Sequence, residues 1–149
     1  MKLNQDLREF IALLNSTGVN YLVVGGHAVA FHGYPRFTGD IDFFIERSSE
    51  NANRLASVLI QFGFGGLGLG TEAFLEPETV VQLGRPPNRI DLLTSIDGVQ
   101  FTEAWAQKAP GELDGLPVNF LGKDHLLTNK RTSARPQDLA DLDKLKGSP

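Results

Sequence analysis

The chain has 149 residues, 41% of them hydrophobic, with no cysteine and a formal net charge of −4. This length suits a single domain with its own core, the apolar share excludes a disordered chain, and the lack of cysteine excludes disulfides and cysteine-bound zinc. The acidic balance argues against broad nucleic-acid binding, which needs a basic face, and no stretch reaches the roughly 18 apolar residues of a membrane span. We expect one soluble, cytoplasmic domain over residues 1–149 with no membrane contact.

Short apolar runs alternate with amphipathic segments in the amino-terminal half. Apolar side chains at helical spacing before Gly18 predict a helix, and the run Tyr21–Val24 before two glycines is typical of a buried strand. The elements expected here are a helix at 6–17, a strand at 21–24, a helix at 27–33, a strand at 40–46 and a helix that Ser48 or Ser49 caps and that runs to Phe62.

The carboxyl-terminal half predicts three more strands and three more helices. Residues 63–70 hold five glycines and lack the lysine that a phosphate-binding loop usually carries, so we expect a loop or a lid there. Because strands follow strands at several points, the fold class is a mixed β-sheet with flanking helices, of the α+β type, and not a strictly alternating doubly wound fold. The further elements expected are strands at 79–83, 89–95 and 116–121 and helices at 102–108, 123–131 and 137–146, with Pro136 suited to the start of the last.

Two carboxylates stand inside the strand expected at 40–46. Side chains alternate across a strand, so Asp40 and Asp42 point to one face while Ile41 points to the other. Burying such a pair without a partner costs several kcal/mol, and a magnesium ion, which prefers oxygen ligands, removes that cost. An Asp-x-Asp pair is also common by chance, with one aspartate capping a turn and the other facing solvent. The pair alone leaves both interpretations open.

Two further features favour the metal interpretation. Gly25-Gly26 ends a buried strand and opens a helix, which lets backbone N–H groups approach a phosphate, although most such pairs are only turns. Asp91, flanked by apolar residues in the strand at 89–95, can complete a triad with the two aspartates, although it could instead be a surface residue at a sheet edge. Three carboxylates on neighbouring strands can hold two Mg²⁺ ions roughly 3.5–4 Å apart.

These residues resemble the signature of a known family. Within the superfamily of polymerase-beta-like nucleotidyltransferases, the pattern is similar to the branch that contains AbiE-type toxins of bacterial toxin–antitoxin systems. The resemblance spans residues from about 20 to 145 and implies a nucleotidyltransferase fold with magnesium-dependent transfer of a nucleoside monophosphate from an NTP. The matching residues are Gly25-Gly26-His27-Ala28, Gly33, Arg36, Thr38, Asp40-Ile41-Asp42, Lys130 and Arg135-Pro136-Gln137-Asp138-Leu139-Ala140-Asp141.

The resemblance also implies roles for individual residues. Asp40 and Asp42 would ligate both magnesium ions, while Asp91 would ligate the catalytic ion and accept the proton of the acceptor. Lys130 would contact the triphosphate and stabilise the departing pyrophosphate. The residues expected at the nucleotide are Gly25, Gly26, Arg36, Thr38 and Lys130, with Arg135 as a further candidate.

Other positions are expected to be structural. Many superfamily members have Ser after the two glycines, and this chain has His27 there, which puts a side-chain phosphate contact at that place in doubt. We expect His27 and His32 to be ordinary residues of a short helix without a metal role. Asp138 and Asp141 are expected to hold the final helices against an arginine. On the competing interpretation, Lys130 is only a solvated surface lysine.

Three functions remain open at this point. The first is a toxin-like enzyme that modifies RNA or a protein and has an antitoxin partner, and the second is an antibiotic-type enzyme that modifies a small molecule. The third is a non-catalytic module that binds a partner protein, but such a module has no reason to gather three costly carboxylates. No separate acceptor-binding domain is visible, so a partner chain or a homodimer is a candidate to supply part of the cleft.

Overall fold

The computed structural model describes residues 3–34, 39–63, 70–86 and 88–147. Within these ranges the strands are β1 (Tyr21–Val24), β2 (Ile41–Ile45), β3 (Val80–Leu83), β4 (Ile90–Leu93), β5 (Ala109–Leu113) and β6 (Leu116–Phe120). The helices are α1 (Gln5–Thr17), α2 (Gly25–Phe31), α3 (Ser49–Gln61), α4 (Phe101–Ala106), α5 (Lys123–Ser133) and α6 (Pro136–Lys146), with a 3-10 turn η2 (Thr71–Phe74).

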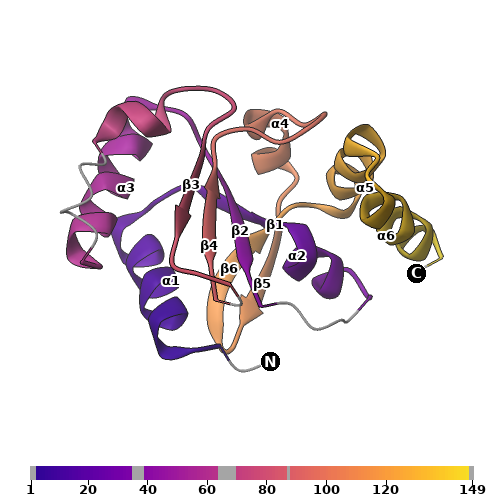
Figure 1. Ribbon diagram of the computed structural model, residues 1–149, viewed down its shortest axis with the longest axis horizontal. Coiled ribbons are helices and arrows are strands. Elements are labelled where there is room, and N and C mark those ends of the chain that lie inside the picture. Colours follow the sequence, from indigo (N-terminus) through magenta and orange to yellow (C-terminus); the bar gives the residue numbers. More distant parts are fainter. Residues whose placement is uncertain (1–2, 35–38, 64–69, 87, 148–149) are drawn as a thin grey trace.

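The strands form one mixed sheet in the order β3-β4-β2-β1-β6-β5 (Figure 1). β2 runs parallel to β4, and β1 runs parallel to β6. The pairs β1–β2, β3–β4 and β5–β6 are antiparallel. The mixed sheet with flanking helices that the sequence predicts is therefore confirmed.

α1 covers one face of the sheet. The Asn4 side chain accepts a hydrogen bond from the Leu7 amide at 2.8 Å and so begins the helix, and Gly18 ends it in the left-handed region at φ 79°. The ring of Phe10 lies 5.9 Å from the ring of Phe43 in β2. The face of the sheet that carries Phe43 is thus the one buried under α1.

α3 lies on the same side of the sheet as α1 (Figure 1). Ser48 caps it, and the fully buried Asn51 ties it to both neighbouring strands. The Asn51 side chain accepts from the Asn20 amide at 2.8 Å and donates to the carbonyls of Asn20 and Glu46 at 3.1 and 2.9 Å. Because Asn20 precedes β1 and Glu46 follows β2, this one side chain fixes α3 against the ends of both strands.

The opposite face of the sheet is covered only in part. Phe101 of α4 packs edge-on against Phe44 of β2, with ring centroids 5.1 Å apart. Figure 1 shows α2, α5 and α6 on the side of the sheet away from α1 and α3. Since side chains alternate along β2, Asp42 shares its face with Phe44 and points away from Phe43. The acidic residues of β2 and β4 therefore lie on this second face.

β5 is the one strand that the sequence does not predict. Pro110 and Gly111 normally argue against a strand, but proline is tolerated at the edge of a sheet. Gly111 also leaves room for two aromatic rings, since a Cβ there would lie 2.6 Å from Phe31 and 2.9 Å from Phe120. The other predicted strands and α-helices are confirmed to within two residues at each end. Most of the loop expected at 63–70 falls outside the described residues.

The described helices are too short or too polar to cross a membrane.

Candidate active site

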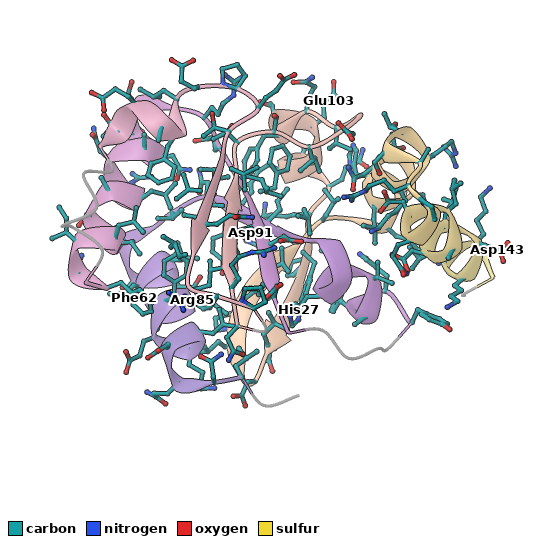
Figure 2. All side chains as sticks on the ribbon, viewed as in Figure 1. His27, Phe62, Arg85, Asp91, Glu103 and Asp143 are labelled. Atoms are coloured by element: carbon teal, nitrogen blue, oxygen red, sulfur yellow. The ribbon has the colours of Figure 1, made fainter. Side chains whose placement is uncertain are left out.

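The pairing of β2 with β4 places two carboxylates side by side. Asp42 and Asp91 are direct register partners in this parallel pair, so both side chains project from the same face of the sheet. Asp91 is 7% exposed and lies near the centre of the molecule (Figure 2). The sequence predicts that Asp91 points away from the core side, as Ile90 and Leu92 point into it. The structure agrees, but the carboxylate is nonetheless buried.

Arg89 links Asp91 to the third aspartate. Arg89 precedes Asp91 by two residues in an extended segment, and its Nε and Nη2 donate to the two carboxylate oxygens of Asp91 at 2.8 and 3.1 Å. The same Nη2 lies 3.7 Å from Oδ2 of Asp40, and the Arg89 backbone amide donates to Oδ1 of Asp40 at 2.9 Å. The structure therefore brings Asp40, Asp42 and Asp91 together around one guanidinium group.

A neighbouring carboxylate makes ionisation of the half-buried Asp42 less favourable. The pKa of Asp42 is raised to about 6, first by burial and then by the charge of Asp91 and a hydrogen bond with it, while Arg89 acts in the opposite direction. The ionised form of Asp42 therefore carries an electrostatic strain. A cation placed against these oxygens would relieve that strain.

Gly25 brings the start of α2 up to these carboxylates. Its φ is 67°, and a Cβ built on it would collide with the Oδ2 atom of Asp42. Val24, the residue before it, is the register partner of Asp42 across β1. Only glycine combines this left-handed conformation with so close an approach. The Gly25-Gly26 pair thus lies where the sequence predicts, at the junction of β1 and α2 beside the acidic pair.

The donor set at this place suits a hard divalent cation. It consists of carboxylate oxygens alone, which are the ligands that Mg²⁺ prefers. As the side chains of the described residues stand, no three acidic or histidine groups are arranged to hold a metal ion. The positive charge beside the carboxylates is instead that of Arg89. The residues fit a magnesium site in chemistry, with a guanidinium group now lying among the ligands.

Lys130 lies in a different environment from the one expected. Its side chain is 7% exposed, and its Nζ lies 3.2 Å from Oδ1 of Asp138 and 3.2 Å from Oδ2 of Asp141. This ion pair joins α5 to α6. The contact of Lys130 with a triphosphate stays a prediction. The buried ion pair differs from the solvated lysine of the competing interpretation. The expectation that Asp138 and Asp141 hold the last helices together agrees with these contacts, with Lys130 as the main partner.

Arg135 is the exposed cation of the same cluster. Its side chain is 77% exposed, and its Nε donates to Oδ2 of Asp138 at 2.7 Å. The pKa of Arg135 is raised mainly by this hydrogen bond and by the charge of Asp138, with smaller contributions from Asp97 and Asp42.

The carboxylate of Asp138 is the anchor of this cluster. Burial raises its pKa, but hydrogen bonds from Arg135, Ser133 and Lys130 outweigh burial and hold the pKa well below its usual range. Asp138 therefore stays ionised at any pH at which the protein is handled. Its charge keeps both cations, Lys130 and Arg135, at the junction of α5 and α6.

Some of the expected site residues cannot be placed. Arg36 and Thr38 fall outside the described residues. His27 is buried on α2, and burial lowers its pKa, as expected for an ordinary helix residue. The Nε2 atom of His32 lies 2.7 Å from the Leu121 carbonyl oxygen. Arg89 was not predicted, although strand alternation already puts it on the same face as Asp91.

A hollow of about 740 Å³ lies towards the carboxyl ends of β2 and β4. Phe44 forms part of its wall and is one strand repeat from Asp42 on the same face of the sheet. Three acidic residues and one basic residue line it, which gives these four a formal net charge of −2. They are Glu46, Glu78, Asp97 and Arg47.

Comparison with known proteins agrees with this geometry. The family described as "Nucleotidyl transferase of unknown function (DUF2204)" matches residues 3–148. No curated protein is significantly similar to the chain.

Two solved structures share the fold. An inferred nucleotidyltransferase of Thermotoga maritima is 15% identical with a TM-score of 0.60, and the match covers 94% of this chain and 88% of the other. An antigenic nucleotidyltransferase-like protein of Paracoccidioides brasiliensis is 19% identical with a TM-score of 0.55, over 96% of this chain and 77% of the other. At these identities the likeness concerns the fold alone. Because the family match spans almost every residue, the chain belongs to the DUF2204 family of nucleotidyl transferases of unknown function.

Proposed function

We propose that this protein transfers a nucleoside monophosphate from an NTP to an acceptor hydroxyl, with two Mg²⁺ ions held by Asp40, Asp42 and Asp91. The observation that carries this proposal is the register of Asp42 with Asp91 on one face of the sheet, directly beside Gly25. Such a pair of carboxylates, with Asp91 buried and Asp42 half-buried, is costly to keep and is of use where cations and phosphates meet.

The reaction exchanges one phosphorus–oxygen bond for another. The acceptor oxygen forms a bond to the α-phosphorus of the NTP, the bond from that phosphorus to the bridging oxygen breaks, and pyrophosphate leaves. Magnesium bound at the aspartates would supply the positive charge that stabilises the α-phosphate and the leaving group. Asp91 is the residue proposed to accept the proton of the acceptor, which is the role that the resemblance implies for it.

Several groups are proposed to hold the triphosphate. Gly25, whose backbone closely approaches Asp42, and Gly26 are proposed to offer backbone amides, and Arg135 offers an exposed cation. Arg36 and Thr38 keep the role that their motif implies. Lys130 would act chiefly by holding α5 and α6, because two carboxylates already surround its ammonium group.

The acceptor is the finer part of the proposal. The toxin-like motif favours RNA or a protein as acceptor, with an antitoxin or a second copy as partner. The hollow beside Phe44 favours a second candidate, a small hydroxyl-bearing cation. The volume of the hollow suits a small molecule, and the acidic lining of the hollow repels the phosphates of RNA.

Transfer of a radioactive label tests the activity. The protein is incubated with Mg²⁺ and each NTP labelled at the α-phosphate, together with total RNA, a protein extract or polyamine-like and aminocyclitol alcohols. The proposal expects label to appear on one class of acceptor, only with Mg²⁺, and not with Asp42→Asn or Asp91→Asn. Labelling by these variants at the wild-type rate would contradict it. Labelling of none of the three classes would favour the non-catalytic module.

A further inference from the structure

We propose that Arg89 is an exchangeable counter-ion of the active site: it balances the aspartates when no metal is bound, and it moves to the phosphates when magnesium and nucleotide enter together. This inference rests on the proposed function. It adds a nucleotide-binding residue that the motifs do not contain. It also explains how three carboxylates stay together in the absence of a metal ion.

The contacts of Arg89 are those of a substitute cation. Its guanidinium group donates to both oxygens of Asp91, at 2.8 and 3.1 Å, and lies 3.7 Å from an oxygen of Asp40. The positive charge of Arg89 also lowers the pKa of Asp42, the register partner of Asp91. The planar fork of an arginine matches a carboxylate in this bidentate way, and its charge does not depend on pH. Among the described residues, Arg89 is the cation in direct contact with these ligands.

A metal ion and the guanidinium group cannot share this place. Magnesium would bind the same Asp91 oxygens to which Arg89 donates, so the two cations compete for them. A divalent ion would also repel the guanidinium charge at such short range. Binding of the metal therefore requires Arg89 to leave Asp91. Its backbone amide can remain on Asp40, because that hydrogen bond does not involve the side chain.

The released side chain has an obvious new partner. Arg89 is 28% exposed, so its guanidinium group already borders solvent. A triphosphate offers oxygens in the geometry that arginine binds best. When metal and NTP bind together, Arg89 leaves the carboxylate of Asp91 and binds the triphosphate instead. When metal arrives alone, Arg89 loses its partner and gains nothing. The site should therefore bind metal weakly on its own and much more tightly with nucleotide.

Binding of Mn²⁺, followed by electron paramagnetic resonance, tests this role without any need for catalysis. Wild type, Arg89→Gln, Arg89→Lys and the control Arg85→Gln are titrated with Mn²⁺ alone and with a non-hydrolysable NTP analogue. Arg85 is an exposed arginine in the same β3–β4 connection (Figure 2). The expected result is that Arg89→Gln binds Mn²⁺ alone about fivefold more tightly than wild type, and Mn²⁺ with the analogue about tenfold more weakly. Arg85→Gln should match wild type in both titrations.

A merely structural arginine would give the opposite sign. If Arg89 only holds the aspartates in place, its removal would scatter them, and Arg89→Gln would bind Mn²⁺ alone more weakly than wild type. That result overturns the proposal. Arg89→Lys covers the case in which the glutamine variant fails to fold. It keeps the charge but not the fork, so tighter binding of Mn²⁺ alone by the lysine variant supports the proposal, and equal or weaker binding overturns it.

The same titrations separate this inference from the proposed function. If wild type binds Mn²⁺ neither alone nor with the analogue, the metal-dependent function itself fails, and the role of Arg89 fails with it. If wild type binds Mn²⁺ with the analogue and Arg89→Gln behaves as a weakened structural variant, only the role of Arg89 is lost.

Discussion

Gly25 lies so close to the carboxylate of Asp42 that a side chain at position 25 would occupy the place of a carboxylate oxygen. The contact joins the first residue of α2 to the central residue of the acidic group. It also makes a sharp test available, because Gly18 has a similar left-handed φ of 79° with open space where its Cβ would be.

Replacing each glycine by alanine should separate the cost of a left-handed backbone from the cost of the collision with Asp42. Both substitutions carry the cost of a left-handed alanine, about 1–2 kcal/mol. Gly25→Ala must also displace Asp42, so it should lower the free energy of unfolding further and weaken binding of Mg²⁺ with NTP, whereas Gly18→Ala should leave that binding unchanged. Urea unfolding and calorimetric titration measure the two effects. Equal stability and equal affinity in the two variants would show that the close approach of Gly25 to Asp42 affects neither folding nor nucleotide binding.

The raised pKa of Asp42 predicts a specific dependence of stability on pH. Since its pKa is about 6, the folded protein keeps a proton that the unfolded chain releases near pH 4, so the free energy of unfolding should fall as pH rises between these values. Without metal, Asp42→Asn should remove this loss and gain roughly 1–3 kcal/mol on wild type between about pH 4 and pH 7.

Urea unfolding at a series of pH values, in the presence of a chelator, measures this difference. Other groups, including Asp138 with its lowered pKa, affect both proteins alike and cancel in the comparison. Parallel stability curves for wild type and Asp42→Asn would mean that the pKa of Asp42 is the same in the folded and unfolded states. Added Mg²⁺ should stabilise wild type at pH 7 more than the variant.

The two cations of the α5–α6 junction should act on different properties. Lys130→Met removes the ammonium group that the buried carboxylates of Asp138 and Asp141 share and should destabilise the protein by about 3 kcal/mol or more. Arg135→Gln, at an exposed position, should change stability by less than about 1 kcal/mol. It should nonetheless weaken NTP binding about tenfold, as expected for a lost charge-assisted contact.

Thermal melts and calorimetry with Mg²⁺ and NTP measure both effects. The reverse pattern, in which Lys130→Met folds normally and loses NTP affinity while Arg135→Gln keeps it, would restore the direct phosphate contact that the motif implies for Lys130.

The acidic group was predictable because it depends on local geometry. Strand alternation puts Asp40 and Asp42 on one face, and apolar neighbours mark Asp91 as part of a second strand. The same rule places Arg89 on the face of Asp91, but a basic residue is not a metal ligand and so does not stand out in an acidic motif. The contact of Arg89 with Asp40, the residue before β2, depends on the pairing of β2 with β4 and is not visible in either segment alone.

The features that the sequence does not predict depend on contacts between distant segments. β5 exists because an edge position tolerates Pro110 and because two rings fill the space beside Gly111. The carboxylates that contact Lys130 lie on the following helix. Only the packing of α5 against α6 therefore decides whether the ammonium group faces these carboxylates or a nucleotide.

The central claim is that Asp40, Asp42 and Asp91 bind a nucleotide through magnesium. Isothermal titration of wild type and Asp42→Asn with each non-hydrolysable NTP analogue, with Mg²⁺ and with chelator, tests it most directly. We expect saturable binding of an analogue to wild type only with Mg²⁺, and affinity about tenfold or more lower for a folded Asp42→Asn. Binding that is the same with chelator, or the same in the two proteins, would contradict the claim.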